Sequence, residues 1–350
     1  MSYFTLIYLK LKGMKTKMSI FCIVLFIILM ILGIPIAVSL GISCVATLYF
    51  FTDIPLNLIA QSMFSSMNSF VMAAVPLFVF AGIIMDEGGV ADKIYNFSNS
   101  AVGWIHGGLG HVNILTSLIF AGMSGSSVAD IASTGKIEIN QMHKHGYLKE
   151  YAAALTISSS MLASIIPPSI LMVVAASVAN VSVGKALFGG LVPGIIIGIA
   201  FMIYNYIYCK KHNIGDKIPF DIKNLLKNFV VAIPALLAPI MLLGGMFTGF
   251  FTPTEAAGIA VLYAILISMF VYKGIKLSDL PNMLFRTTKT TGTILFIAVT
   301  AKAATWIFEY DGLPARVAAA ITSLSSNTTI VMFIIFAFLI VLGMFMDATA

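Results

Sequence analysis

Two stretches of small and polar residues interrupt otherwise apolar sequence: AGMSGSSVADIASTG at Ala121–Gly135 and SSSMLASIIPPS at Ser158–Ser169. Glycine, serine and carboxylate groups are costly at membrane depth. Backbone that is not helical survives there only where it is buried in protein or lines a polar cavity. Two such interruptions close together in the sequence therefore predict a binding site built from broken helices, an arrangement typical of secondary transporters.

The composition is that of a membrane protein. Apolar residues make up 59% of the 350 residues and charged residues 10%, with a mean hydropathy of +1.01, whereas soluble domains carry about 25% charged residues. Apolar runs long enough to span about 30 Å recur along the chain. The net charge of +6 comes from Lys and Arg that cluster between these runs, so it indicates topology and not nucleic-acid binding. The three cysteines match no metal site or disulfide framework.

Apolar blocks and their interruptions define the expected helices. Block 18–51 contains Gly33-Ile34-Pro35 and is either one kinked helix or two short pieces. Block 55–86 ends at a polar stop, and residues 90–105 are amphipathic and suited to the membrane interface. Further spans are expected at about 187–208, 229–247, 254–272, 290–308 and 328–346.

The two interruptions predict a hairpin and a broken helix. Residues 112–142 form an apolar–polar–apolar unit with arms too short for full spans, so we expect a re-entrant helical hairpin with its tip at Ser124–Ser127. A helix over 151–183 is expected to break at Pro167-Pro168, because proline removes a backbone donor. Lysine-rich loops at 209–228 and 273–289 predict that the hairpin enters from the cytoplasmic side.

An internal repeat divides the chain. Pro55 is followed by Asn68, and Pro314 by Asn327, at the same spacing, and the pattern GxxMD follows in both copies at 82–86 and 343–347. Such repeats underlie many transporter folds. We therefore expect an all-α polytopic transporter.

The expected organisation is a flank at 1–17 and one membrane domain over 18–350. The flank bears lysines and is either cytoplasmic or an over-long gene start before Met18. The first repeat is expected over about 33–208 and the second over about 229–350. The sequence ends at Ala350, before the second repeat could form a hairpin that matches the first. We therefore expect either a fragment or a natural truncation, in which half of a site built from both repeats is missing.

The candidate site combines both interruptions. Sodium prefers a cage of oxygen ligands, which freed carbonyls and hydroxyls supply, whereas a carboxylate substrate prefers backbone N–H groups at helix N-termini. A Gly- and Ser-rich tip facing a proline break provides both kinds of group. The candidate residues are Ser124, Gly125, Ser126 and Ser127 at the tip, and Ser158, Ser159, Ser160, Pro167 and Pro168 in the broken helix.

Other polar residues have two possible roles each. Asp130, three residues past the tip, either helps to hold sodium or caps a half-helix. Asn68 and Asn327 either bond exposed carbonyls or touch ions. Thr252 and Thr254 open a helix, for which Thr252 is a good N-cap, and are possible additional site residues.

Four stretches resemble one family in the same order along the chain. They are FAGMSGSSVADIAS (120–133), the AAALT-to-IIPPS run (152–169), VSVGKALFGGLVPG (181–194) and FTPTEAA (251–257). They resemble the DctM-like large membrane subunit of tripartite ATP-independent periplasmic (TRAP) transporters, and the resemblance covers about 18–350.

This resemblance implies an elevator-type transporter fold, a function and partners. The family imports organic acids, such as C4-dicarboxylates or sialic acids, with sodium ions as the coupling ions and without another cofactor. It works with a periplasmic substrate-binding protein and a small four-helix membrane subunit, here expected as a separate chain, in the lipid of the bacterial inner membrane. The absent second hairpin is the departure from the family.

Three alternatives compete with this interpretation. A one-component sodium-coupled carboxylate or anion transporter would need no binding protein. A polytopic membrane enzyme is disfavoured because no HExxH sequence is present and Ser, Thr, Gly and Pro rarely catalyse without a base. We therefore expect no enzyme. A pure scaffold would not explain broken helices at membrane depth.

Overall fold

The computed structural model describes residues 18–214, 219–324 and 327–343, which form helices joined by turns, without a strand. Four of these helices are long and apolar enough to cross a membrane, or five if the bent pair α4–α5 is counted as one span. The prediction of an all-helical polytopic membrane protein is therefore confirmed. The chain divides into two compact units, residues 1–69 with 292–350 (unit 1) and residues 70–291 (unit 2).

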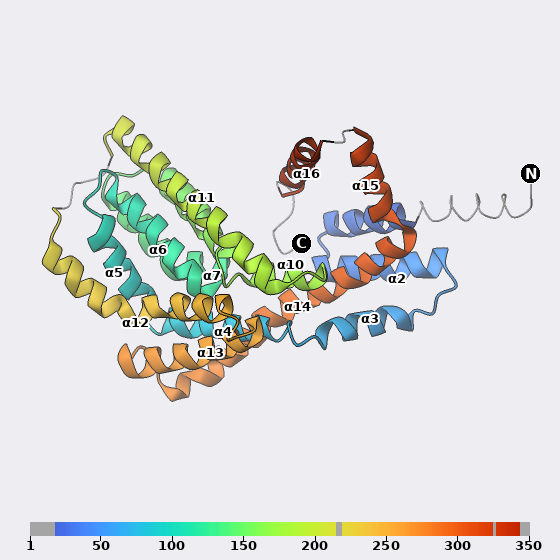
Figure 1. Ribbon diagram of the computed structural model, residues 1–350, viewed down its shortest axis with the longest axis horizontal. Helices are drawn as coiled ribbons and strands as arrows, with labels where there is room; N and C mark the ends of the chain where they lie inside the picture. Colours follow the sequence, from blue (N-terminus) through green and yellow to red (C-terminus); the bar gives the residue numbers. More distant parts are fainter. Residues whose placement is uncertain (1–17, 215–218, 325–326, 344–350) are drawn as a thin grey trace, which may run out of the picture. The chain divides into compact units, whose positions relative to one another are not determined.

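Unit 1 begins with two helices that cover the first apolar block. A helix over Met18–Ile31 ends before Gly33, which has φ +80° and nothing within 4 Å of a Cβ built on it. Pro35 then precedes α2 (Ile36–Phe51), so the block is two pieces. The other elements of the unit are α3 (Asn57–Met67), the last turns of α14 (Leu280–Asp311), α15 (Leu313–Leu324) and α16 (Thr328–Gly343) (Figure 1).

The core of unit 1 joins its first helix to the end of α14. Cys22, Cys44, Leu48 and Ile307 are fully buried in one cluster. The Asp311 carboxylate, also buried, accepts from the Ser19 backbone N–H at 3.2 Å and from the Arg316 guanidinium at 2.7 Å. Asp311 thus links the N-terminal helix, through a hydrogen bond, to α15, through an ion pair.

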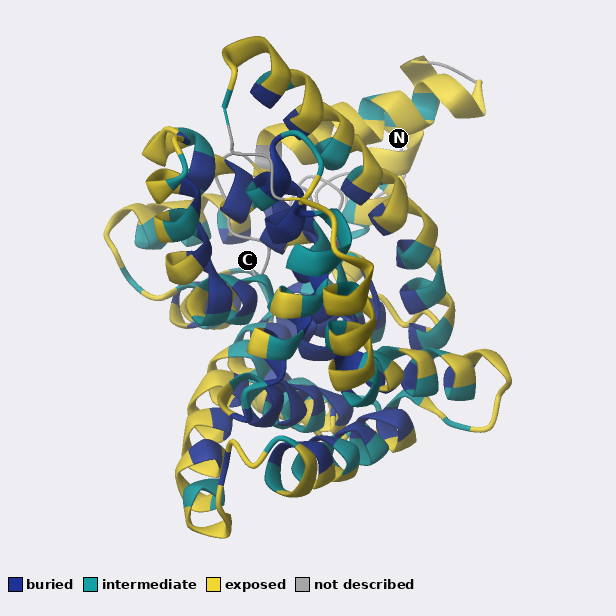
Figure 2. Ribbon diagram, turned by 90° about the vertical axis from the view of Figure 1, so that its left-hand side faces the viewer, coloured by how far each residue is buried: buried dark blue, intermediate teal, exposed yellow. Residues whose placement is uncertain are grey.

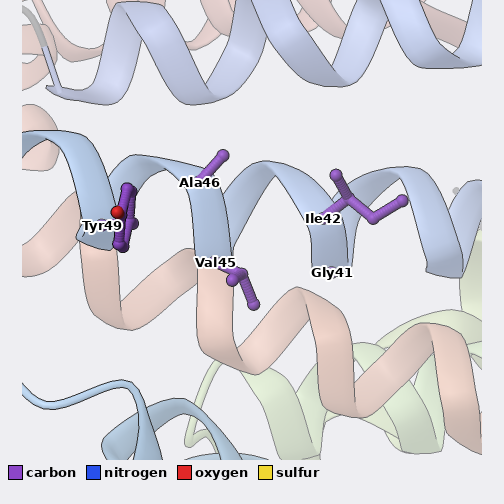
Figure 3. Close-up of a pocket in the computed structure, with 5 residues that line it drawn as sticks. All are labelled: Gly41, Ile42, Val45, Ala46 and Tyr49. Atoms are coloured by element: carbon purple, nitrogen blue, oxygen red, sulfur yellow. The ribbon is translucent and has the colours of Figure 1, made fainter.

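An apolar hollow of about 420 Å³ lies on α2 in unit 1 (Figure 3). Tyr49 has the one polar side chain in its lining, so the hollow offers little to a charged ligand. The lining residues are Gly41, Ile42, Val45, Ala46 and Tyr49.

Unit 2 contains the hairpin and the broken helix. The second apolar block is not one helix, because α3 ends at Met67 and α4 (Ala74–Glu87) begins after a turn. α5 (Val90–Val102) is bent by 67° from α4 at Gly88-Gly89. α4 packs against α13, and α5 against α12 and α6 (Figure 1). The remaining elements are α6 (Gly108–Ser124), α7 (Ser127–Asp130), η1 (Ile131–Gly135), α8 (Lys136–Lys144), α9 (Lys149–Ser160), η2 (Met161–Ser164), α10 (Ile170–Val178), α11 (Val183–His212), α12 (Ile222–Phe247), α13 (Pro253–Leu266), η3 (Ile267–Val271) and η4 (Leu277–Asp279).

Helix α6 forms the centre of unit 2. Thirteen of its 17 residues are buried, whereas only 22% of the apolar window of α11 is buried. Exposed faces dominate many of the other helices, as the colouring in Figure 2 shows. Asn205 ties α11 to this centre, since its side chain donates to the Gly107 carbonyl and accepts from the Tyr151 hydroxyl, both at 3.0 Å. The first arm of the hairpin is therefore held on all sides by protein.

Candidate functional site

The segment predicted as a hairpin folds as one. α6 ends at Gly125, which adopts the left-handed conformation at φ +60° and reverses the chain. α7, the π-helical segment η1 and α8 run back as one continuous helix, and the Asn113 amide on α6 lies 2.7 Å from the Glu138 carboxylate on α8. The tip therefore lies where the sequence predicted it. Its entry into a membrane from one side stays a prediction.

The broken helix is also present. α9 continues into the 3-10 turn η2, the chain then leaves helical geometry around the cis Pro167–Pro168 peptide, and α10 begins at Ile170. Ser169 caps the new helix, because its hydroxyl accepts from the Met172 backbone N–H at 3.2 Å and donates to the Ser164 carbonyl at 2.7 Å. Side-chain capping thus satisfies the backbone that the prolines leave open.

The tip and the break are in direct contact. The Ile170 backbone N–H donates to the Gly125 carbonyl at 3.1 Å. A Cβ on Gly125 would overlap the Pro168 carbonyl oxygen and lie 3.0 Å from its carbonyl carbon, so only glycine fits. The hydroxyls of Ser127 and Ser164 hydrogen-bond beside this contact. The predicted pairing of the two interruptions is observed, although their role in binding stays a prediction.

Four helix ends meet at this contact. α6 and η2 end there, and their last carbonyls carry partial negative charge. The continuous α7–α8 helix and α10 begin there, with Ser126 and Ser169 as their N-caps, and their first N–H groups carry partial positive charge. One small region therefore offers both cation-binding carbonyls and anion-binding amides.

The carboxylate of Asp130 is buried inside this hairpin. Its side chain is 1% exposed, and neither carboxylate oxygen has a hydrogen-bond partner within the described part of the chain. Ser126, not Asp130, caps α7, since its hydroxyl accepts from the Ala129 N–H at 3.3 Å. The capping role considered for Asp130 is therefore not observed. A buried carboxylate without partners is costly, so a cation near Asp130 would stabilise it.

Other candidates lie elsewhere. Thr252 and Glu255 form the capping box of α13, with Glu255 Oε2 2.8 Å from the Thr252 N–H, so local capping explains this motif. The Thr254 hydroxyl donates to the Phe70 carbonyl at 2.9 Å. Asn68 follows α3 in unit 1, and Asn327 accepts from the Thr329 N–H at the start of α16.

Of the three predicted serines at 158–160, Ser159 joins a network of side chains. Its hydroxyl donates to the Asn113 amide oxygen at 2.6 Å. The Ser160 hydroxyl donates to the Ile157 carbonyl of its own helix at 2.8 Å, and Ser158 is half-buried. Asp347, the last residue of the second GxxMD pattern, lies outside the described residues.

Several polar residues at the site were not predicted. Asn113, Ser117 and Glu138 are buried on the two hairpin arms, and Thr156 and Ser164 come from the broken helix. The available signal was position: Asn113 and Glu138 lie on the two arms at nearly equal distances from the tip.

Comparisons with known proteins agree with this architecture. The family described as "Tripartite ATP-independent periplasmic transporter, DctM component" matches residues 23–350. The sialic acid TRAP transporter large permease protein SiaM of Vibrio cholerae is 34% identical over 92% of this chain and 75% of its own length. The C4-dicarboxylate TRAP transporter large permease protein DctM of Pseudomonas aeruginosa is 33% identical over 89% of this chain and 73% of its own.

A longer relative aligns along almost the whole chain. The sialic acid TRAP transporter permease protein SiaT of Haemophilus influenzae is 34% identical over 98% of this chain, which spans about half (55%) of that relative. The family match covers far more than half of the chain, and the relatives exceed 30% identity over most of it. This multi-pass membrane protein belongs to the DctM family of TRAP transporter large permeases.

Proposed function

We propose that this chain is the large permease subunit of a sodium-coupled, binding-protein-dependent importer of organic acids in the bacterial inner membrane. The observation that carries the proposal is the contact between the hairpin tip at Gly125 and the proline break at Pro168, where four helix ends converge. The relatives named above transport sialic acid or C4-dicarboxylates by their names, and both kinds of substrate carry carboxylates.

The substrate carboxylate binds at the helix N-termini. α7 begins two residues after Gly125, and α10 begins at Ile170, whose N–H donates to the Gly125 carbonyl. Both N-termini therefore lie beside Gly125, where the dipoles of the two helices favour an anion. The hydroxyls of Ser126 and Ser127 add donors without adding charge. This arrangement recognises the carboxylate and leaves selection of the rest of the substrate to the binding protein.

Sodium binds to the C-terminal ends of the other two helices at this contact, α6 and η2. Carbonyls at the ends of α6 and η2, with serine hydroxyls, supply oxygen ligands. Asp130 supplies a buried charge that lacks a protein partner within the described residues. Each sodium ion that moves inward contributes about 2.3 kcal/mol per 100 mV of membrane potential, in addition to its concentration gradient. Sodium bound first orders the tip for the carboxylate.

The transport step is an elevator movement. The hairpin and the broken helix belong to the same compact unit, which supports movement of the loaded site as one rigid body. The small four-helix membrane subunit and the periplasmic binding protein complete the assembly, as the TRAP names of the relatives imply.

Reconstitution tests the proposal. The permease is reconstituted in liposomes with its small subunit. Radiolabelled sialic acid or succinate is supplied in complex with the purified binding protein, and its uptake is measured. We expect uptake that requires an inward sodium gradient and is abolished when potassium replaces sodium. Uptake without the binding protein would favour a one-component transporter instead. Equal uptake in sodium and potassium would overturn sodium coupling.

A further inference from the structure

A buried cluster of polar side chains lies between the two hairpin arms and α9. Asn113 on α6, Glu138 on α8, and Thr156 and Ser159 on α9 are each no more than 2% exposed. Asn113 is the hub of this cluster. Its Nδ2 lies 2.7 Å from Glu138 Oε2 and 2.8 Å from Thr156 Oγ1, and its Oδ1 lies 2.6 Å from Ser159 Oγ. A single side chain therefore joins both hairpin arms to the broken helix.

The hydrogen-bond directions in this cluster are determined. The Thr156 hydroxyl gives its proton to the Ala152 carbonyl at 2.8 Å, so toward Asn113 its oxygen can only accept. The amide nitrogen of Asn113 must therefore face Thr156, and the other hydrogen of that nitrogen reaches Glu138. This orientation holds whether Glu138 is charged or neutral, because a carboxyl oxygen accepts in both forms.

The orientation of Asn113 decides the state of Ser159. With its nitrogen turned toward Thr156 and Glu138, Asn113 presents its carbonyl oxygen to Ser159, whose hydroxyl donates at 2.6 Å. The Ser159 proton is thereby directed to Asn113 Oδ1, which is nearer than its second acceptor, the Thr156 carbonyl of the same helix at 3.1 Å. Within the described residues, the Ser159 oxygen receives a long bond, at 3.4 Å, from the Ser117 hydroxyl, so a lone pair remains for a cation. A hydroxyl in this state is a better ligand for sodium than one free to rotate.

We propose that Asn113 is a positioning residue for the coupling cation: it holds Ser159 as an oriented oxygen ligand, and Thr156 and Glu138 hold Asn113 in the required orientation. This inference rests on the proposed function, because it names the Ser159 hydroxyl as one ligand of the sodium ion that the proposed function requires. Both amide hydrogens and the amide oxygen of Asn113 form hydrogen bonds with protein groups, so Asn113 itself does not contact the ion.

The test measures sodium affinity separately from folding and maximal rate. The half-saturating sodium concentration is determined for uptake in proteoliposomes containing the whole transporter, and for the rise in melting temperature of the purified permease when NaCl replaces KCl. Asn113→Asp keeps the shape of the side chain but removes both donors and places an oxygen against Thr156. We expect the half-saturating sodium concentration to rise about tenfold in both assays.

Two variants serve as matched controls. Glu138→Gln retains a carbonyl oxygen for Asn113, and we expect a change below about threefold, since one hydrogen bond is kept. Thr116→Val removes a buried hydroxyl from the same helix that has no partner in the described residues. We expect sodium affinity to stay at the wild-type value. If Asn113→Asp does not accumulate, Ser159→Ala removes the ligand directly, and the same rise is expected.

The outcomes separate this inference from the proposed function. If the wild-type protein shows no sodium dependence in either assay, sodium coupling is wrong and this inference falls with it. If the wild type responds to sodium but Asn113→Asp, or Ser159→Ala in its place, lowers only the maximal rate or the melting temperature, the cluster is merely structural and this inference alone is overturned.

Discussion

Replacing Gly125 by alanine should disrupt the site more than the same change at another left-handed glycine. Alanine at φ +60° costs about 1–2 kcal/mol because its Cβ crowds the backbone. The added methyl would also lie 3.0 Å from the Pro168 carbonyl carbon, whereas carbon atoms prefer about 3.5–4.0 Å. Because the methyl would also overlap the Pro168 carbonyl oxygen, the tip and the break must separate by about 1 Å.

This separation removes a specific hydrogen bond. The Ile170 N–H to Gly125 carbonyl distance of 3.1 Å would lengthen beyond the normal limit of about 3.2 Å, with a loss of about 1 kcal/mol. The expected total is about 2–3 kcal/mol of stability, the sum of the backbone and hydrogen-bond losses. Because the binding groups would be displaced by up to about 1 Å, we expect sodium-driven uptake to fall on the order of tenfold or more.

Gly146→Ala is the matched control for this change. Gly146 also has a positive φ, +88°, but a Cβ added there would meet nothing within 4 Å. It should therefore lose only the backbone contribution of about 1–2 kcal/mol and retain near-normal uptake. Melting temperature in detergent and uptake in proteoliposomes are measured for both variants. Equal melting temperatures and equal rates for the two would refute the reasoning that the tip must touch the break.

Three further changes test other parts of the structure by melting temperature. Asn205→Ala removes two buried hydrogen bonds that tie α11 to α6 and α9, with an expected loss of about 1–3 kcal/mol; an unchanged melting temperature would contradict this. Thr252→Ala should cost about 1 kcal/mol through the capping box of α13 and leave sodium affinity unchanged, whereas a shift in sodium affinity would place Thr252 in the site. Arg316→Ala leaves Asp311 buried without its guanidinium partner. The expected loss is roughly 2 kcal/mol, less than for a fully enclosed pair because Arg316 is partly exposed, and Arg316→Lys should recover part of it.

Local sequence chemistry predicted the elements that carry the site. Gly125 ends a helix because glycine adopts positive φ without strain, and Pro167-Pro168 ends another because proline lacks a donor. Thr252 caps α13 as predicted for the same kind of reason, and Glu255, three residues further on, completes a capping box with it. These features depend on neighbouring residues, so they can be predicted before the fold is known.

The second apolar block shows the limit of that approach. Residues 55–86 are predicted as one block, whereas the structure has two helices separated by a turn after Met67. Mean hydropathy indicates whether a segment is apolar and not whether the chain turns within it. The polar stretch SSMNS at 65–69, which lies at this break, was the available signal.

The sequence by itself determined the membrane class, the family and the two interruptions, because composition, glycine and proline act locally. Only the tertiary structure decided that Gly125 meets Pro168, and that Asn113 joins Glu138, Thr156 and Ser159. These partners lie on different helices, far apart in the sequence. Which polar side chains meet depends on how the helices pack, and the need to pair every buried polar group then fixes the contacts.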